Sequence, residues 1–129
     1  MPEILGAKEA SGFNCYFHAG ETHDASLTNM HDAVLLGSKR MGHGFQLSLF
    51  PNLIKEVIER DICIEACALS NMVLGYTLDL RNHPLRYLMH HGLQVSISSD
   101  DPGFFNYQGV TLDFAYVTLA WELDLMDLK

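Results

Sequence analysis

The segment Gln94–Pro102 reads QVSISSDDP, a run of alternating and β-branched side chains that ends in two adjacent carboxylates. The first six residues are typical of a β-strand. Asp100 and Asp101 follow this strand directly. In parallel sheets of alternating strands and helices, polar side chains at the carboxyl ends of strands open into a site. The segment therefore predicts a buried strand that delivers two acidic groups to such a site.

Two earlier segments repeat this arrangement. The short apolar run Asn14–Ala19 carries His18 near its end and continues into Gly20 and Glu21. His43 lies between two glycines at the end of another brief strand. Three strand ends that carry metal-binding or proton-transferring groups indicate one site built from several strands, which is the arrangement of a (β/α) barrel enzyme.

Strand and helix patterns alternate along the whole chain. The predicted strands are Asn14–Ala19, Lys39–His43, Asp61–Cys67 and Gln94–Ser99, and the predicted helices are Asn29–Leu36, Phe50–Arg60, Pro84–His91 and a segment from Thr111 onward. This alternation predicts βα units on a parallel sheet. Four strands are half of an eight-stranded barrel, so we expect an α/β fold that is part of a (β/α)8 TIM-type barrel.

Length and composition agree with this interpretation. The chain has 129 residues, whereas a complete barrel typically needs about 250. A net charge of −8 argues against a nucleic-acid surface. No apolar stretch approaches the ~20 residues of a membrane helix, and no signal peptide is visible at Met1. Because half a barrel exposes two sheet edges and the inner faces of its strands, which we expect to be apolar, the isolated chain is expected to associate.

The three cysteines give no disulfide framework, because their number is odd. Cys63 and Cys67 lie in or beside an apolar run, which favours buried apolar side chains. A Cys-x₃-Cys zinc pair is the alternative, but no second pair of cysteines or histidines has a matching spacing. His83 precedes Pro84, where it can cap or brace the start of a helix.

Each candidate residue can be interpreted as part of a functional site or as an ordinary structural residue. His18 is a suitable zinc ligand and Glu21 a possible general acid, although either could lie in a solvated loop. His43 could approach a ligand closely, but its flanking glycines also suit a tight turn. Asp100 could bind a metal ion while Asp101 bonds a substrate, or the pair could form an Asx-type turn before the proline.

Four longer strings carry a resemblance to a known family. They are Phe17–Thr22 (FHAGET), Arg40–Phe45 (RMGHGF), Asp79–Pro84 (DLRNHP) and Ile97–Pro102 (ISSDDP). Together they resemble the adenosine deaminase superfamily, and within it the adenosine deaminase growth factor family of secreted deaminases. The resemblance extends from about Ala7 to the last predicted helix. It implies that residues 1–129 form a partial metal-dependent hydrolase domain, the C-terminal portion of the catalytic barrel.

The resemblance also implies a role for each candidate. His18 and Asp100 would be zinc ligands, and Asp100 would also contact the attacking water. His43 would orient that water and help to deprotonate it. Zinc lowers the pKa of a bound water towards ~7, which would supply hydroxide at neutral pH.

The remaining implied roles concern the substrate, adenosine or 2′-deoxyadenosine. Glu21 would protonate N1 of the purine while water attacks C6, so that ammonia leaves and inosine remains. Asp101 would accept a hydrogen bond at N7, and Gly20 would also belong to the substrate-binding residues. The resemblance further implies secretion and a homodimeric complete protein.

The chain departs from the family pattern in two ways. It has no His-x-His pair, which supplies two further zinc ligands in the family, so the isolated chain is expected to bind zinc weakly and to be inactive. Ala68 stands where the family usually has proline, which is expected to loosen the turn after the third strand. Two alternatives remain open: a non-catalytic fragment or truncated isoform that acts by association, and an AMP or adenine deaminase relative. The absence of a basic cluster beside the motifs argues against a phosphate site.

Overall fold

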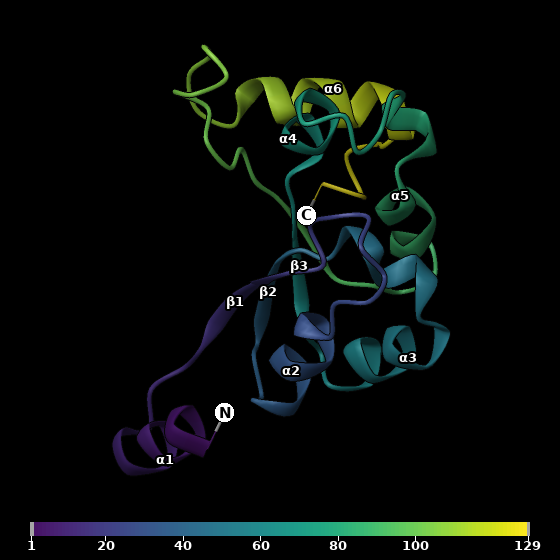
Figure 1. Ribbon diagram of the computed structural model, residues 1–129. Coiled ribbons are helices and arrows are strands. Elements are labelled where there is room, and N and C mark those ends of the chain that lie inside the picture. Colours follow the sequence, from purple (N-terminus) through teal and green to yellow (C-terminus); the bar gives the residue numbers. More distant parts are fainter. Residues whose placement is uncertain (1, 129) are drawn as a thin grey trace.

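Four parallel β-strands form the sheet of the protein in a computed structural model that describes residues 2–128 (Figure 1). The strands are β1 (Tyr16–Ala19), β2 (Arg40–His43), β3 (Cys63–Ala66) and β4 (Val95–Ile97), and they lie side by side in chain order. Every pairing is parallel. All four predicted strands are present, each shorter than predicted, and the predicted α/β fold with a parallel sheet is confirmed.

Helices connect the strands. They are α1 (Pro2–Ser11), α2 (Asn29–Leu35), α3 (Pro51–Glu59), α4 (Ala68–Val73), α5 (Pro84–Met89) and α6 (Thr111–Trp121), with 3₁₀ turns η1 (Phe45–Leu49) and η2 (Leu80–Asn82). The four predicted helices are confirmed, and both α3 and α5 begin at a proline, which suits a first helical turn. The sequence did not predict α1 or α4. Ala68 begins α4 and is fully buried, so the loosened turn expected there is not seen.

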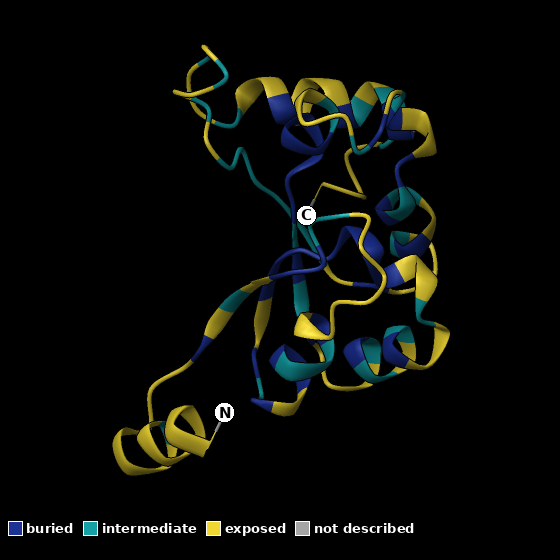
Figure 2. Ribbon diagram, viewed as in Figure 1, coloured by how far each residue is buried: buried dark blue, intermediate teal, exposed yellow. Residues whose placement is uncertain are grey.

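One face of the sheet packs against the helices and forms the core. Met41, Ile64 and Ala66 point to this face and are completely buried. In Figure 1, α2, α3 and α5 lie on this side of the sheet, and Figure 2 shows the buried residues gathered between them and the strands. The core therefore lies between the sheet and its connecting helices, as in one sector of a (β/α) barrel.

The other face of the sheet is open and largely polar. Tyr16 pairs with Arg40, and His18 pairs through Gly42 with Glu65, so these residues share this face. Tyr16, His18 and Arg40 are exposed, and Arg40 forms an ion pair with Glu65 at 2.9 Å. The expectation that this inner face is apolar is therefore wrong, because its strand positions carry polar and charged side chains.

The burial of the cysteines agrees with the expectation of largely buried side chains. Cys15 and Cys67 are buried, Cys63 is half-buried, and all three are free thiols. Within residues 2–128, no helix has both the length and the apolar character needed to cross a membrane.

A buried histidine fastens the helices on the core side. The Nδ1 atom of His83 accepts a hydrogen bond from the Leu85 N–H at 3.3 Å, which confirms the predicted cap of α5. Its Nε2 therefore carries the proton and donates to Oδ1 of Asn71 at 3.1 Å. The ring also packs against Phe45 and Trp121, with centroids 5.2 and 5.4 Å away. His83 thus connects η1, α4, α5 and α6.

Acid should destabilise the protein through His83. Burial lowers the pKa of His83 from 6.5 to about 4, so the unfolded chain binds a proton more readily than the folded one. Through His83, stability should therefore be highest above pH 6.5, fall by on the order of 3 kcal/mol between pH 6.5 and about 4, and level off below that. The melting temperature of His83→Asn, which retains a capping side chain, should depend less on pH between 7 and 4.5 than that of the unchanged protein. His90→Asn alters an exposed histidine and should leave this dependence intact; an equal effect of both variants would contradict the assignment.

Candidate active site

Three of the residues singled out in the sequence meet at the carboxyl edge of the sheet. His18 lies near the end of β1, His43 ends β2, and Asp100 follows β4. One potential ligand atom from each lies within 4.8 Å of the others. Among residues 2–128 this is the one group of histidine, cysteine, aspartate and glutamate side chains that meets such a spacing.

Two members of this cluster adopt an unusual backbone conformation. The φ angles are 70° at His43 and 57° at Asp100, in the left-handed region that L-residues other than glycine seldom adopt. Such conformations cost free energy and concentrate at functional sites. At each strand end, the turn aims the side chain into the cluster at the expense of local backbone stability.

His43 is the buried member of the cluster. Its side chain is 1% exposed, and its Nε2 lies 3.7 Å from Oε2 of Glu21. Its Nδ1 is buried and has no hydrogen-bond partner within the described part of the chain. The neighbouring His18 ring is exposed, with its centroid 5.3 Å from that of His43. A buried nitrogen without a partner marks a position where a further group would complete the site.

Ser70 holds Asp100 in place. The Ser70 hydroxyl, on α4, donates a hydrogen bond to Oδ2 of Asp100 at 2.6 Å, and Ser70 is completely buried. A hydrogen bond to a carboxylate is stronger than one between neutral groups. The sequence does not indicate this contact, because 30 positions separate the two residues and no spacing pattern links them.

Gly20 makes the turn that returns Glu21 to the cluster. Its φ is 69°, and a Cβ there would collide with the side chain of Met30. The Gly20 N–H donates to Oδ1 of Asn29 at 3.1 Å, and its carbonyl accepts from the Gln46 N–H at 3.0 Å. The local requirement for glycine is therefore conformational.

A hollow of about 540 Å³ opens beside the cluster. It is lined by His18, Gly42, Glu65, Cys67, Ile97, Ser98, Ser99, Asp100, Asp101 and Val110. Asp101 is exposed, so it lies on the wall of the hollow that faces solvent. The hollow places a bound molecule next to both His18 and Asp100.

The donor set fits a divalent metal ion of the zinc type. Two imidazoles and a carboxylate are common zinc ligands, and their donor atoms already lie close together. Neither Cys63 nor Cys67 belongs to the cluster. Burial, followed by nearby Asp100 and Glu65, raises the pKa of Cys67 to about 12, and a protonated thiol is a poor ligand. The cluster therefore supports the histidine and carboxylate site rather than a cysteine pair.

Comparison with known proteins identifies the family. The family model described as adenosine deaminase matches residues 5–127. The chain belongs to the adenosine deaminase family. A Dictyostelium discoideum protein named adenosine deaminase 2 is 47% identical over 125 residues, and the match covers 97% of this chain and 23% of that protein. Human adenosine deaminase 2 is 40% identical over 132 residues, with 98% and 26% covered. The chain thus spans about a quarter of these adenosine deaminase relatives.

Solved structures of deaminases share the fold. An adenine deaminase from Arthrobacter aurescens matches with a TM-score of 0.84 at 25% identity, over 97% of this chain and 38% of that one. An Arabidopsis protein crystallised with GMP matches with a TM-score of 0.79 at 18% identity, over 98% of this chain and 36% of that one. The expectation that the chain forms part of a (β/α)8 barrel is confirmed.

Proposed function

We propose that the chain forms part of the active site of a zinc-dependent adenosine deaminase, which converts adenosine or 2′-deoxyadenosine and water into inosine or 2′-deoxyinosine and ammonia. The observation that carries the proposal is the cluster of His18, His43 and Asp100, with Glu21 beside it, in a chain of this family. The remaining strands would complete the barrel, and a protein that contains them together with this chain is called the complete-barrel protein below.

His18 and Asp100 would hold the zinc ion, with further ligands supplied by the rest of the barrel. When bound, zinc would act as a Lewis acid that makes a water molecule nucleophilic near neutral pH. His43 is buried and held close to both ligands, so it would orient the attacking water and accept its proton. Ser70 would keep the Asp100 carboxylate facing the metal ion.

Glu21 and Asp101 would act on the purine. Glu21 would deliver a proton to N1 while water adds to C6, so that negative charge does not build up on the ring. The proton that His43 takes from water would pass to the amino group, so that the C6–N6 bond breaks and ammonia leaves. The proton of the new C6 hydroxyl would then restore Glu21 and leave the 6-oxo product. Because N7 of a neutral purine has a lone pair and no hydrogen, a direct bond requires Asp101 to carry the proton. Asp101 would therefore be the donor of this hydrogen bond, and the expectation that it accepts one is wrong on chemical grounds. The implied substrate contact of Gly20 remains part of the proposal.

The charge around the hollow favours a nucleoside over a nucleotide. Among the residues that line it, none is a lysine or arginine, whereas Glu65, Asp100 and Asp101 are acidic. Arg40 lies on the same face of the sheet and is already paired with Glu65. A phosphate would therefore meet acidic groups at the part of the site that this chain forms.

Similarity to proteins named adenosine deaminase 2 supports two finer proposals about the complete protein, secretion and a homodimeric state. Both follow from the family resemblance. Detection of the protein in culture medium and its mass by light scattering would test them.

The proposed activity predicts a simple assay result. The complete-barrel protein should convert adenosine to inosine, measured as loss of adenosine absorbance near its ultraviolet maximum, and a chelator should abolish the conversion until zinc is restored. The isolated chain should show no turnover, because His18 and Asp100 are two ligands and catalytic zinc sites usually have three. Preference for AMP or adenine would identify the related deaminase activity instead. No turnover of any of these substrates by the zinc-loaded complete-barrel protein would favour a non-catalytic role.

A further inference from the structure

The loop between β4 and α6 carries Asp100 and Asp101 and folds back on itself. The Phe105 N–H donates to the Asp101 carbonyl at 3.1 Å, and the Tyr107 N–H donates to the Pro102 carbonyl at 2.9 Å. None of the loop residues 98–110 is fully buried, and Phe104 is 84% exposed. Its orientation over the hollow therefore depends on few contacts with the rest of the protein.

Tyr107 makes such contacts at the end of the loop. Its hydroxyl lies 3.1 Å from the Ser99 carbonyl oxygen and 3.2 Å from Oδ1 of Asp113. Burial, together with nearby Asp113, raises the pKa of Tyr107 to about 12, so the phenol keeps its proton and remains a donor. One hydroxyl thus links the residue before Asp100 to the first turn of α6.

Asp113 is a buried acidic group that the proposed chemistry does not use. It is completely buried, and burial raises the pKa of its carboxyl group. Oδ1 faces Tyr107, whereas Oδ2 has no hydrogen-bond partner among residues 2–128. Burying a carboxyl group lowers the stability of the folded protein unless hydrogen bonds offset the loss of water. The bond from Tyr107 is therefore important for Asp113.

The helix that carries Asp113 is firmly attached to the protein. Val117 and Trp121 are the other buried residues of α6, and Nε1 of Trp121 donates to the Leu80 carbonyl at 2.9 Å. Asp113 is therefore a fixed point to which the end of the loop can be attached. Tyr107 makes this attachment, because its hydroxyl donates a hydrogen bond to the Asp113 carboxyl group.

We propose that Tyr107 and Asp113 are positioning residues that clamp the loop and set the orientation of Asp101 over the hollow. The inference rests on the proposed adenosine deaminase function. Ser70 holds Asp100 independently at 2.6 Å, so release of the clamp should disturb Asp101 more than Asp100. The clamp should therefore affect substrate binding more than the metal site or the chemical step.

The test is Tyr107→Phe in the zinc-loaded complete-barrel protein, because it removes the hydroxyl and keeps the ring. The KM for adenosine should rise about tenfold while kcat stays within about twofold. The reason is that a displaced Asp101 would bind adenosine less tightly, whereas the groups that carry out the reaction stay in place. Zinc content should not change. Amide hydrogen exchange in residues 101–107 should become about tenfold faster, with no change in α3 or β2.

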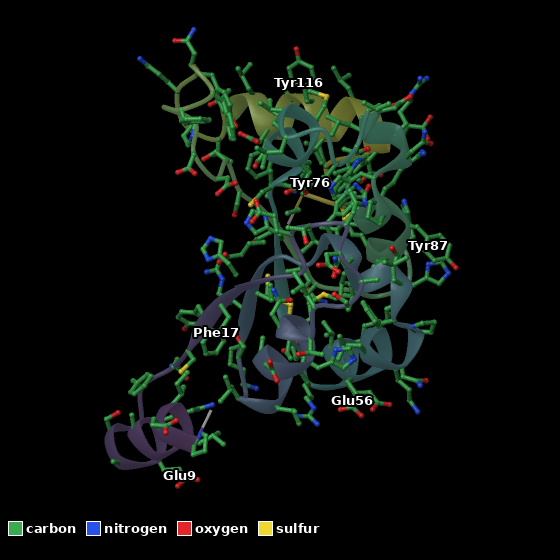
Figure 3. All side chains as sticks on the ribbon, in the orientation of Figure 1. Glu9, Phe17, Glu56, Tyr76, Tyr87 and Tyr116 are labelled. Carbon is green, nitrogen blue, oxygen red and sulfur yellow. The ribbon has the colours of Figure 1, made fainter. Side chains whose placement is uncertain are left out.

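Two further variants sharpen the test. Asp113→Leu, which removes the acceptor oxygen and keeps a similar side-chain shape, should raise KM in the same way. The double variant should add little to either single one, because the two side chains act through one contact. Tyr116 projects outward from α6 and is about half exposed (Figure 3), so Tyr116→Phe is the matched control and should change nothing.

Unchanged KM and unchanged loop exchange in Tyr107→Phe would overturn the clamp, as would faster exchange spread evenly over α4, α5 and α6. These results are distinct from failure of the proposed function. If the unchanged protein turns over no adenosine, the deaminase proposal fails, whereas loop exchange in Tyr107→Phe still shows whether the clamp exists.

Discussion

Replacement of Glu21 by glutamine is expected to lower kcat for adenosine by about 10²–10⁴-fold in the complete-barrel protein, the usual effect of losing a general acid. Glutamine has nearly the same shape but cannot give a carboxyl proton to N1. Glu21 is outside the metal-binding cluster, with Oε2 3.7 Å from Nε2 of His43. Zinc content should therefore remain that of the unchanged protein, which separates loss of the acid from loss of the metal ion.

The matched control is Glu9→Gln, the same substitution at an exposed position of α1 (Figure 3). This helix precedes the amino end of β1, whereas the site lies at the carboxyl edge of the sheet. Its rate and its zinc content should both be unchanged. Initial rates from the ultraviolet absorbance and metal analysis of the same samples provide the measurement. A Glu21→Gln variant with an unchanged kcat would contradict the role of Glu21 as the proton donor to N1.

The helices and strands were predictable where the spacing of apolar residues agreed with residues that typically begin or end such elements. The helix α3 has a clear apolar face and Pro51 at its start, and β4 is rich in β-branched residues. The helix α1 was missed because its sequence has no apolar face of helical period. In agreement with this, none of its residues is buried. The helix α4 was missed because it is only six residues long, which is too short to show a helical period.

The polarity of the inner sheet face could not be predicted from the sequence alone. The sequence marks Tyr16 and Arg40 as polar, but only the register between strands shows that they lie side by side on the face opposite the helices. In half a barrel, this face lacks the cover that the remaining strands give. Its polarity reduces the apolar area that the open sheet presents. The expectation that the isolated chain associates therefore rests on the two exposed sheet edges.

Within the site, the sequence identified groups at strand ends but not the groups that hold them. His18, His43 and Asp100 could be grouped, because parallel strands bring their carboxyl ends to one edge. Ser70, Tyr107 and Asp113 could not, since their roles depend on side-chain contacts between a helix and a loop. Supporting residues of this kind lie at no fixed distance in sequence from the groups they hold, so the structure is needed to find them.

Loss of the Asp100 carboxylate should remove both the metal ion and the activity. Asp100→Ala deletes one ligand of the cluster and leaves the buried Ser70 hydroxyl without its acceptor. Changes to groups that only support a metal ligand typically lower affinity 10–100-fold, so loss of the ligand itself should weaken zinc binding by more than about 100-fold. Adenosine turnover should fall below detection at zinc concentrations that saturate the unchanged protein.

Asp100→Asn separates the ligand charge from the backbone. The φ of 57° at this position suits aspartate and asparagine better than alanine, so the asparagine variant should keep the turn and lose only the negative charge. Zinc titration of both variants, followed by a dye competition assay, gives the affinities, and circular dichroism reports whether the fold persists. We expect Asp100→Asn to fold normally and still to bind zinc poorly. Full zinc occupancy and normal turnover in this variant would exclude Asp100 as a ligand, because an amide oxygen does not replace the charge that a carboxylate supplies to the ion.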